Sequence, residues 1–443
     1  MKVWVLFISD EGLDTEVIWK LLIFHFQAVD WNLFFYVYSQ HCCKCAQPAT
    51  CFSGTEDEFR LVYSTVSDNV GYGVNVQDIR SKVFVNTSEV SRNQFGAGIR
   101  VYQGAGEVII NNTRLESNAD AGINITYSGG YQLINNTHLV RNKGYGIITE
   151  YLQLNRSRIE FMQKMEIVRG QFLFNELIGL RVGNYCRGGY VLVNESVFSF
   201  NQDEAIEYLS CNFTGYARRD MEHLSHFFTN FSVAFTDFTG NVRHGILMKP
   251  LLNTVGIITN CSFTNHSLGA LRIDNGYDLL ISKWYRMFPV NYHIFENRFE
   301  QNSGRYAVYL RLTDTSPLHK MYFKFNTLVN NRIQESFLYT NPRNRANAVA
   351  VVSSRNIQFK RNILENREHS VRELATHLLD PSVKIDATEN YWGIEIYRSS
   401  DFEVVHASIF DLDDRYNLAQ VVYYPALKTS RFYENQLTSD VAE

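Results

Sequence analysis

Proline is scarce in this sequence, and neither sign of charge dominates. Only 7 of the 443 residues are proline, and 42 Lys and Arg against 46 Asp and Glu leave a formal net charge of −4. Because proline cannot donate a backbone hydrogen bond, its scarcity suits long stretches of regular β-structure. The chain has no basic stripe of the kind that nucleic-acid binding requires, so we expect no nucleic-acid partner.

The chain also lacks a clean apolar run of membrane-spanning length. A span needs about 20 mainly apolar residues, but the longest candidate, Val17 to Tyr38, is interrupted by Lys20, His25 and Asp30. The opening "MKVWVLFISDEG" has a basic residue and an apolar stretch, yet acidic residues follow too soon for a good signal peptide. We therefore predict an irregular leader over residues 1–57, with a degenerate signal region as one interpretation, and no membrane attachment from this chain itself.

What the sequence does contain is an internal repeat. "VIINNTRLESNADAGINI" from Val108 is followed by "QLINNTHLVRNKGYGII" from Gln132. Small residues that precede an apolar pair recur with a base period of 24, as between Gly98 and Gly122, and longer steps indicate loop insertions. These anchor residues are Gly73, Gly98, Gly122, Gly146, Gly179, Ala205, Gly245, Gly269 and Ala307. Such a period is typical of a solenoid.

Within a repeat, short apolar alternations are separated by turn residues. No 3.6-residue apolar period persists, so helical repeats do not fit. Three short strands per repeat predict an all-β fold, a right-handed parallel β-helix of about ten coils over residues 58–393. Equivalent residues then lie above one another, so we predict that the repeated corner asparagines point inward and hydrogen-bond from coil to coil through their amides. They include Asn135, Asn136, Asn297, Asn326 and Asn362.

Cysteine is distributed unevenly. Four of the seven cysteines lie in "HCCKCAQPATC", which ends at Cys51 and has no second Cys/His pair at zinc spacing. Local disulfides or an irregular leader are favoured over a metal site there, and we expect no metal and no cofactor. Cys186 and Cys211 follow successive anchors by seven and six residues, which suggests a disulfide between neighbouring coils. Two buried free thiols are the alternative, and Cys261 is free or bonded elsewhere.

N-glycosylation sequons are dense in the repeats. An Asn-rich repeat with Thr and Ser in its turns generates some of them by itself, but their density favours a secreted, glycosylated chain. The ten candidate sites are Asn86, Asn111, Asn124, Asn135, Asn155, Asn194, Asn212, Asn230, Asn260 and Asn265.

The repeats end near "VKIDATENYWG", and a cap of helix plus strand is predicted over residues 394–428. Val404, Val405, Ile409 and Phe410 fall at helical spacing, and "QVVYYPAL" is a strand that Pro425 stops. Trp392 and the helix would cover the last coil, whose open edge otherwise invites aggregation. Three cap carboxylates, Asp411, Asp413 and Asp414, are expected to be solvated charges at the helix end. Residues 429–443 form a tail or a linker to a further module.

Parallel β-helices include polysaccharide hydrolases and lyases, so an active site has to be sought. Galacturonan hydrolases of this shape carry N-x-D, D-D, G-H-G and R-x-K on consecutive coils. The nearest matches are "NQDEAIE", with Asp203, Glu204 and Glu207, and "RHGI" at Arg243. An arginine–lysine element is not found, nor is the acidic trio with an arginine that a calcium-dependent lyase needs. We expect no catalytic residues, with Glu204 and Glu207 as the first to test.

Passive sugar binding is a separate possibility. Tyr127, Tyr131 and Tyr145 could form an aromatic platform on which sugars stack, or they could simply pack along the wall of the coils.

Three long segments carry a resemblance to a known family. "ATENYWG", "IFDLDDRYNLAQVVYYPAL" and "NPRNRANAVAVVSSRNIQFKRNILEN" resemble β-helix modules of the bark beetle (Anakonda) family, over residues 58–428. N-Y-W-G followed by a D-x-x-D stretch and Y-x-P-x-L also closes many unrelated pectin-lyase-like β-helices, so the resemblance rests on the longer segments. Family members are large animal transmembrane proteins of tricellular septate junctions, whose ectodomains also contain scavenger-receptor cysteine-rich and C-type-lectin-like domains.

The resemblance implies a non-enzymatic extracellular module at cell–cell junctions. Its partners would be protein ectodomains, homophilic or not, and its parent protein would lie in the plasma membrane. Because the family's span, lectin-like domain and further modules are missing here, we expect a fragment or a short paralogue. The alternative is a secreted β-helix that binds or cleaves polysaccharide.

Overall fold

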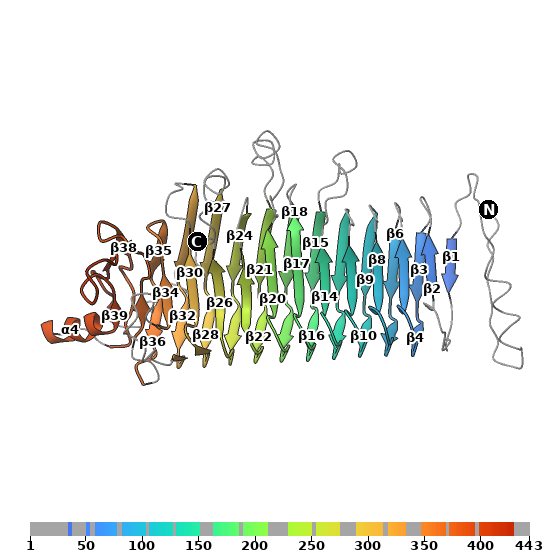
Figure 1. Ribbon diagram of the computed structural model, residues 1–443, viewed down its shortest axis with the longest axis horizontal. Helices are drawn as coiled ribbons and strands as arrows, with labels where there is room; N and C mark the ends of the chain where they lie inside the picture. The colour runs from blue at the N-terminus through green and yellow to red at the C-terminus, as the bar shows by residue number, and fades with distance from the viewer. Residues whose placement is uncertain are drawn as a thin grey trace, which may run out of the picture.

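The computed structural model describes residues 34–37, 50–53, 58–77, 82–102, 106–126, 130–150, 163–185, 189–210, 229–249, 254–274, 289–312, 318–333, 347–368, 372–394 and 398–428. Figure 1 shows a rod of stacked strands whose colour changes steadily along its length, so neighbouring repeats are neighbours in space. The strands form three long parallel sheets. The predicted right-handed parallel β-helix is confirmed.

Sheet A has 14 strands. They are β1 (Phe34–Val37), β3 (Glu58–Val62), β6 (Lys82–Asn86), β9 (Glu107–Asn111), β12 (Tyr131–Asn135), β15 (Gln163–Val168), β18 (Gly189–Asn194), β21 (Thr229–Ala234), β24 (Thr254–Thr259), β27 (Val290–Phe295), β31 (His319–Lys324), β35 (Ile357–Lys360), β38 (Lys384–Asp386) and β40 (Gln420–Val422).

Sheet B has 13 strands. They are β2 (Thr50–Ser53), β5 (Val74–Gln77), β8 (Ile99–Tyr102), β11 (Ile123–Thr126), β14 (Ile147–Glu150), β17 (Leu180–Tyr185), β20 (Ile206–Ser210), β23 (His244–Met248), β26 (Gly269–Asp274), β30 (Val308–Arg311), β34 (Ala350–Val352), β37 (Leu374–Ala375) and β39 (Ile409–Phe410).

Sheet C has 11 strands, and two further short strands pair separately. Those of sheet C are β4 (Thr65–Ser67), β7 (Glu89–Ser91), β10 (Arg114–Glu116), β13 (His138–Val140), β16 (Gln171–Leu173), β19 (Val197–Ser199), β22 (Asp237–Thr239), β25 (Ser262–Thr264), β28 (Arg298–Glu300), β32 (Thr327–Val329) and β36 (Ile363–Glu365). The separate pair is β29 (Ser303–Gly304) and β33 (Arg332–Ile333).

One coil runs from sheet A through sheet C to sheet B, as β12, β13 and β14 do. Alternate residues of each strand point inward, so Gln132 and Ile134 of β12 are buried while Tyr131 and Leu133 are partly exposed. The corner between sheets A and C is a single residue with positive φ, such as Asn136 at 47°. This left-handed conformation reverses the chain within one residue, which asparagine tolerates better than most side chains.

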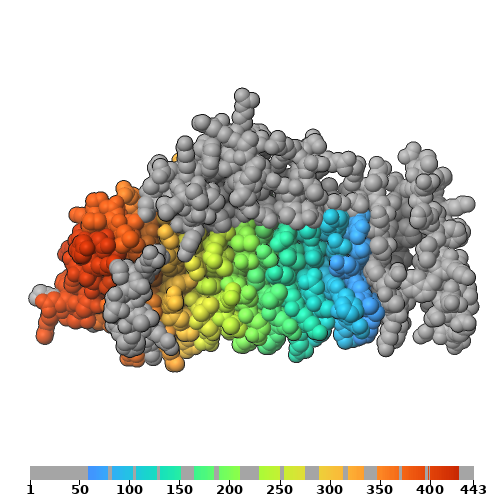
Figure 2. Space-filling view, viewed as in Figure 1, coloured from blue at the N-terminus to red at the C-terminus, as the bar shows by residue number. Residues whose placement is uncertain are grey.

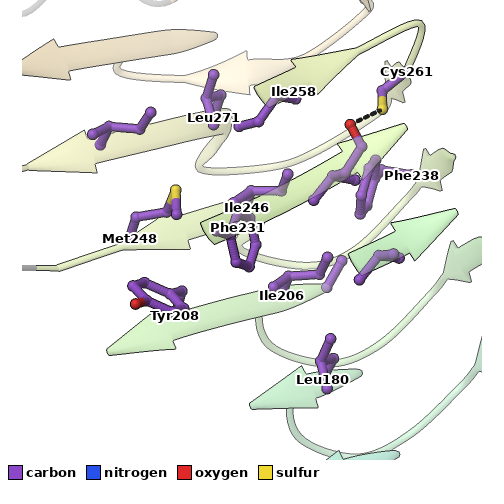
Figure 3. Packing of buried hydrophobic residues seen from close by; sticks show 14 of the residues in the cluster. Leu180, Ile206, Tyr208, Phe231, Phe238, Ile246, Met248, Ile258, Cys261 and Leu271 are labelled. Atoms are coloured by element: carbon purple, nitrogen blue, oxygen red, sulfur yellow. Dashed lines mark hydrogen bonds between the residues drawn. The ribbon is translucent and has the colours of Figure 1, made fainter. Parts of the chain in front are cut away.

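The core is a column of apolar side chains from all three sheets. Figure 3 shows Ile206 and Tyr208 of sheet B facing Phe231 of sheet A, with Phe238 of sheet C beside them. Along sheet C successive phenylalanine rings stack, with centroids 4.1 Å apart for Phe172 and Phe198. Equivalent residues of successive repeats thus pack against one another, which gives one continuous core.

Two buried ladders follow the corners, and they confirm coil-to-coil bonding through side-chain amides. Between sheets C and B, Nδ2 of Asn118 donates to Oδ1 of Asn142 at 3.0 Å, and Asn142 donates to Asn175 at 3.0 Å. The fully described run is Asn69, Asn93, Asn118, Asn142, Asn175, Asn201 and Asn241, and it resumes at Asn302, Asn331 and Asn366. His266 stands between the two parts; its ring contacts the carbonyl of Asn241, and its backbone N–H donates to Asn302.

The prediction of which asparagines point inward is partly wrong. Asn297, Asn326 and Asn362 do form a buried ladder at the corner between sheets A and C. Asn136, by contrast, is exposed and bonds the exposed Asn112 at 2.8 Å, and Asn135 is only half-buried. The reason is register: Asn136 occupies the positive-φ corner, which faces solvent, whereas the next position, Thr137, faces the interior.

The predicted alignment of one anchor is also wrong by one residue. Gly269 was aligned with Gly245, but β23 pairs with β26 so that His244 lies beside Gly269. A Cβ built on Gly245 would come within 2.7 Å of the carbonyl oxygen of Ala270, which identifies Ala270 as its true counterpart. The row before the anchors therefore contains His244 and Gly269 on neighbouring coils.

The rod ends in a helix and two short strands. Helix α4 (Ser399–Ala407) buries Val405 and leaves Val404 47% exposed. The predicted helix was too long, because Ile409 and Phe410 form β39 and pair with β37. Strand β40 pairs with β38 and continues sheet A. In the part of the chain that the structure describes, no helix is long and apolar enough to cross a membrane.

Candidate functional site

One position of the repeat, beside the start of each strand of sheet B, changes in residue type over four successive coils. It lies just before the anchors. Tyr72 and Tyr145 occupy it on two coils, and on several others it is small or apolar, as at Ala97, Ala121 and Ile178. On the next two coils it holds Glu204 and His244, which are only 2% and 5% exposed. Buried polar side chains are costly unless they are hydrogen-bonded, so this departure from the repeat needs partners.

The partners come from the row itself. Nδ1 of His244 lies 3.3 Å from Oε1 of Glu204, and Nε2 lies 3.1 Å from the hydroxyl of Tyr306. Tyr306 is two coils from His244, and it reaches across because Gly269 stands between them. A Cβ on Gly269, whose φ is +136°, would come within 2.8 Å of the Tyr306 ring. Glycine is required there both for its conformation and for this close approach.

Protonation in this group is set by burial. Desolvation lowers the pKa of His244 to about 3, so its ring is neutral near pH 7. A neutral imidazole with Nδ1–H donating to Glu204 accepts the Tyr306 hydroxyl hydrogen at Nε2. Desolvation likewise raises the pKa of Tyr306 to about 12, so that hydroxyl keeps its hydrogen.

A carboxyl pair lies on the solvent side of the same group. Desolvation raises the pKa of Asp203 to about 6, and the hydrogen bond to Glu204 and its charge act in the same direction. Nε of Arg243 lies 2.9 Å from Oδ1 of Asp203, and its Nη1 lies 3.8 Å from Glu204. The Arg243 side chain is 54% exposed, so it forms the outer edge of the group.

Two more arginines extend the group across the outer face of sheet B. Nε of Arg181 lies 3.2 Å from Glu207, and burial raises the pKa of that carboxyl. Nη2 of Arg272 lies 3.0 Å from the buried Asp274, and its guanidinium lies over the Tyr309 ring at 5.4 Å. We call Asp203, Glu204, Arg243, His244, Arg272 and Tyr306 the sheet B cluster.

The carboxyl groups of the sheet B cluster are engaged with neighbouring side chains. A glycosidase holds two carboxyl groups about 5 to 9.5 Å apart, so that a nucleophile or water fits between them and the sugar. Here Asp203 pairs with Arg243, and Glu204 is engaged with His244 and lies 3.8 Å from Arg243. Asp274 also occupies the position, two residues after Arg272, where R-x-K carries lysine. Among the described residues no group of His, Cys, Asp and Glu is placed to hold a metal ion.

Sequence reasoning found four of the six residues of this cluster, since the motif "RHGI" also contains His244. It singled out Asp203, Glu204, Glu207 and Arg243, and the structure brings the first two and Arg243 together while Glu207 pairs with Arg181. It missed Arg272 and Tyr306. The place of Arg272 follows from the strand pairing. Leu247 of β23 lies beside Glu207 of β20, and Arg272 of β26 lies beside Leu247.

The candidate glycosylation sites occupy the outer surface wherever they are described. Asn230, Asn260 and Asn265 are exposed, and Asn86, Asn111, Asn124, Asn135 and Asn194 are half-buried. Asn86, Asn111 and Asn135 are stacked on successive strands of sheet A. Asn155 and Asn212 lie outside the described residues. These positions leave the eight described side chains accessible from solvent, and glycosylation stays a prediction.

Of the three tyrosines considered as a sugar platform, the two that are described lie on different sheets. Tyr131 lies on sheet A, where its hydroxyl donates to Glu166 at 2.7 Å and Lys164 lies 5.1 Å from its ring. Tyr145 lies at the edge of sheet B and accepts a hydrogen bond from Arg181 at 2.9 Å. Tyr127, like Cys186 and Cys211, lies outside the described residues. Cys261 is a buried free thiol whose Sγ lies 3.1 Å from the carbonyl of Thr259.

The cap residues have unequal roles. Trp392 is fully buried against the last coil, with its ring 6.4 Å from that of Tyr423. Asp411 was expected to be solvated, but it is 3% exposed, and Oδ2 accepts the backbone N–H of Val421 at 2.7 Å. Asp413 and Asp414 are exposed. Asp411 is buried because its carboxylate accepts the Val421 hydrogen bond at the edge of β40, where a further strand would otherwise pair.

A shallow groove of about 510 Å³ runs along the corner between sheets A and C on the N-terminal coils. Its floor is formed by Ser64, Ser88 and Thr113, whose hydroxyls donate to backbone carbonyls two residues earlier. Because these hydroxyl hydrogens already have acceptors, the groove floor offers a ligand little to bind.

Comparisons with known proteins agree with the fold. A family model described as a right handed beta helix region matches residues 51–214. The protein named Protein bark beetle, from Drosophila melanogaster, is 37% identical over 390 residues, which cover 84% of this chain and 12% of that protein. This chain therefore corresponds to a small part of that relative's length.

Proposed function

Because the chain belongs to the bark beetle family, we propose that it is a non-enzymatic structural module of an extracellular junction protein in epithelia. The observation that carries the proposal is the 37% identity over 84% of the chain. The tricellular septate junction is the place that the family suggests, and the plasma membrane is where the parent protein would be held.

The described coils have the mechanical properties that such a module needs. Eleven strands stack in sheet C, and at ~4.8 Å per coil they make a rod of roughly 50 Å. Figure 2 shows the coils as narrow bands of colour, each packed directly against the next. One core and the amide ladder between sheets C and B connect neighbouring coils, and from Asn297 onward a second ladder is added, so bending would break buried hydrogen bonds. A rod of this kind suits a spacer between membranes.

The outer surface supports an extracellular location. All eight described sequon asparagines are exposed or half-buried, and none lies in the core. The lateral sheets would carry the contacts with partner ectodomains, either homophilic or with other proteins. The engagement of Asp203 with Arg243, and of Glu204 with His244, supports the non-enzymatic part of the proposal, since both carboxyl groups already have partners.

The test is where the chain is exposed in a living epithelium. An antibody raised against the described coils is applied to intact, non-permeabilised cells, and the protein is digested with peptide N-glycosidase. We expect staining concentrated where three cells meet and a drop in apparent mass after digestion. Staining that requires permeabilisation, together with an unchanged mass, would contradict the proposal.

A further inference from the structure

The sheet B cluster is a feature of the rod that structural repetition does not explain. We propose that it is a binding site for a neutral, hydroxyl-rich sugar ring, which it holds without cleaving. The site is independent of the junction role, because it depends only on the arrangement of side chains on the outer face of four coils.

The cluster departs from the repeat on consecutive coils. Glu204 and His244 are buried polar residues in a row that is small, apolar or tyrosine on the described coils before them, and Gly269 takes φ +136° so that His244 and Tyr306 can meet. Buried polar side chains and unusual backbone conformations cost free energy and gather at functional sites. The described coils that precede Glu204 hold no charged or titrating imidazole side chain at this position: Ala121 and Ile178 are apolar, and Tyr145 is a tyrosine.

The charges of the cluster also constrain the ligand. A cation is disfavoured because Arg243 already lies 2.9 Å from Asp203 and 3.8 Å from Glu204. An anion, such as a uronate, is disfavoured because the carboxylate of Asp274 lies 3.0 Å from Arg272 and neutralises it. With donors and acceptors interleaved and little net charge, the group fits a ligand whose groups both donate and accept.

Sugar hydroxyls have that property. A vicinal diol donates one hydrogen bond to a carboxylate and accepts another from a guanidinium. The side chains of Arg243, Arg272 and Asp203 are 54%, 26% and 23% exposed, so they can touch a ligand directly. Glu204 and His244 lie beneath them, with side chains 3% and 7% exposed. These two are positioning residues, which hold Asp203 and Tyr306 in place.

The test is direct binding of small neutral sugars. Saturation-transfer NMR is recorded on the whole chain with the methyl pyranosides of glucose, galactose, mannose and N-acetylglucosamine. We expect saturable binding of at least one of them in the millimolar range, and binding at least tenfold weaker after Arg243→Gln. Arg243 is half-exposed, so the variant should keep the wild-type melting temperature.

The chain offers a closely matched control. Arg92 also pairs with an aspartate one coil away, with Nε 2.9 Å from Asp68 and a side chain 55% exposed. We expect Arg92→Gln to bind as wild type does. Absence of saturable binding for all four sugars would overturn the site, and so would equal loss in the two variants.

The ligand class and the absence of cleavage have separate readouts. Tetragalacturonate should bind more weakly than the best neutral sugar, and tighter binding of the acid would overturn the neutral assignment. Incubation of the protein with a neutral tetrasaccharide of the best-binding sugar should release no new reducing ends. Release that Asp203→Asn abolishes would show a hydrolase and overturn the non-cleaving part of the proposal.

Discussion

At the scale of single residues, asparagine has different roles at two positions of the same coil. Asn136 and Asn142 stand six residues apart in one repeat, and both bond an asparagine of the preceding coil. Asn136 does so on the surface, whereas Asn142 is fully buried and donates to both Leu115 and Asn175. The difference comes from the corner: Asn136 takes the left-handed position, and Asn142 follows one.

This difference gives a first prediction. Replacing Asn142 with alanine should lower the free energy of unfolding by about 2 to 4 kcal/mol, because several buried groups lose partners at once. Asn136→Ala should change it by less than about 0.5 kcal/mol, as surface substitutions usually do. Urea unfolding followed by circular dichroism measures both. Equal effects of the two variants would show that burial of the ladder contributes little.

A second prediction concerns pH. Glu373 ends the interior ladder, where its carboxyl accepts two hydrogen bonds from Asn366, at 2.8 and 2.7 Å. Burial raises the pKa of Glu373 to about 7, above its unfolded value of about 4.3. The folded state therefore binds this proton more tightly, so the stabilisation is complete below about pH 4 and is lost as the pH rises through 7.

Unfolding midpoints at about pH 5 and pH 8 test it. We expect the wild type to lose stability over this interval and Glu373→Gln to lose less, since glutamine does not titrate. The exposed Glu176, on a distant coil, provides the control, and Glu176→Gln should keep the wild-type slope. A slope unchanged by Glu373→Gln would mean that another group titrates.

The residues of the sheet B cluster could be predicted only in part, because the predicted register between neighbouring repeats was wrong by one residue at Gly269. Asp203, Glu204 and Arg243 stand out as charges beside an anchor, and sequence alone finds them. Gly269 was placed one position from its true row, so the approach of Tyr306 to His244 could not be seen. In a strand a shift of one residue exchanges the inner and outer faces, and a single sequence does not fix the register that closely.

At the scale of elements, the repeat itself was enough to predict the fold. A period of 24 residues with three apolar alternations leaves few other architectures, because identical coils bury identical faces when they stack. The element that went wrong was the cap helix. Ile409 and Phe410 fit its apolar spacing, but β37 offered them an open edge, and pairing with that edge prevailed over local helical pattern.

The phenylalanine stack of sheet C gives the third prediction. Phe198 is fully buried between Phe172 and Phe238, with ring centroids 4.1 and 5.3 Å away. Phe198→Ala should cost about 3 to 5 kcal/mol of unfolding free energy, as expected for a cavity left by a buried ring.

Phe200 is the matched control for this cost. It also stacks on a ring of the preceding coil, Phe174 at 5.3 Å, but it is 46% exposed. Phe200→Ala should cost about 1 kcal/mol or less, because an exposed pair contributes only its ring contact. If thermal unfolding ranks the two variants the other way, ring stacking rather than burial stabilises sheet C.

At the scale of the whole molecule, a stack of parallel coils needs a way to stop. Each coil presents a complete set of strand edges to the next, and an uncovered edge can pair with another molecule. Strands β39 and β40 end sheets B and A, and α4 lies beside them at the tip of the rod (Figure 1). Phe402 of α4 meets Tyr424 at 5.5 Å, so the helix is held against the chain that follows β40.

Two adjacent residues of α4 allow this capping role to be tested. Val405 is fully buried, so Val405→Asp places a charge in the core, which should release the helix and uncover the last coil. Val404 is 47% exposed, and Val404→Asp adds the same charge without entering the core. Light scattering over a range of concentrations should show association of the Val405 variant alone. If both variants match the wild type, the terminal strands resist pairing without the helix, and Trp392 with Asp411 would be sufficient to close the rod.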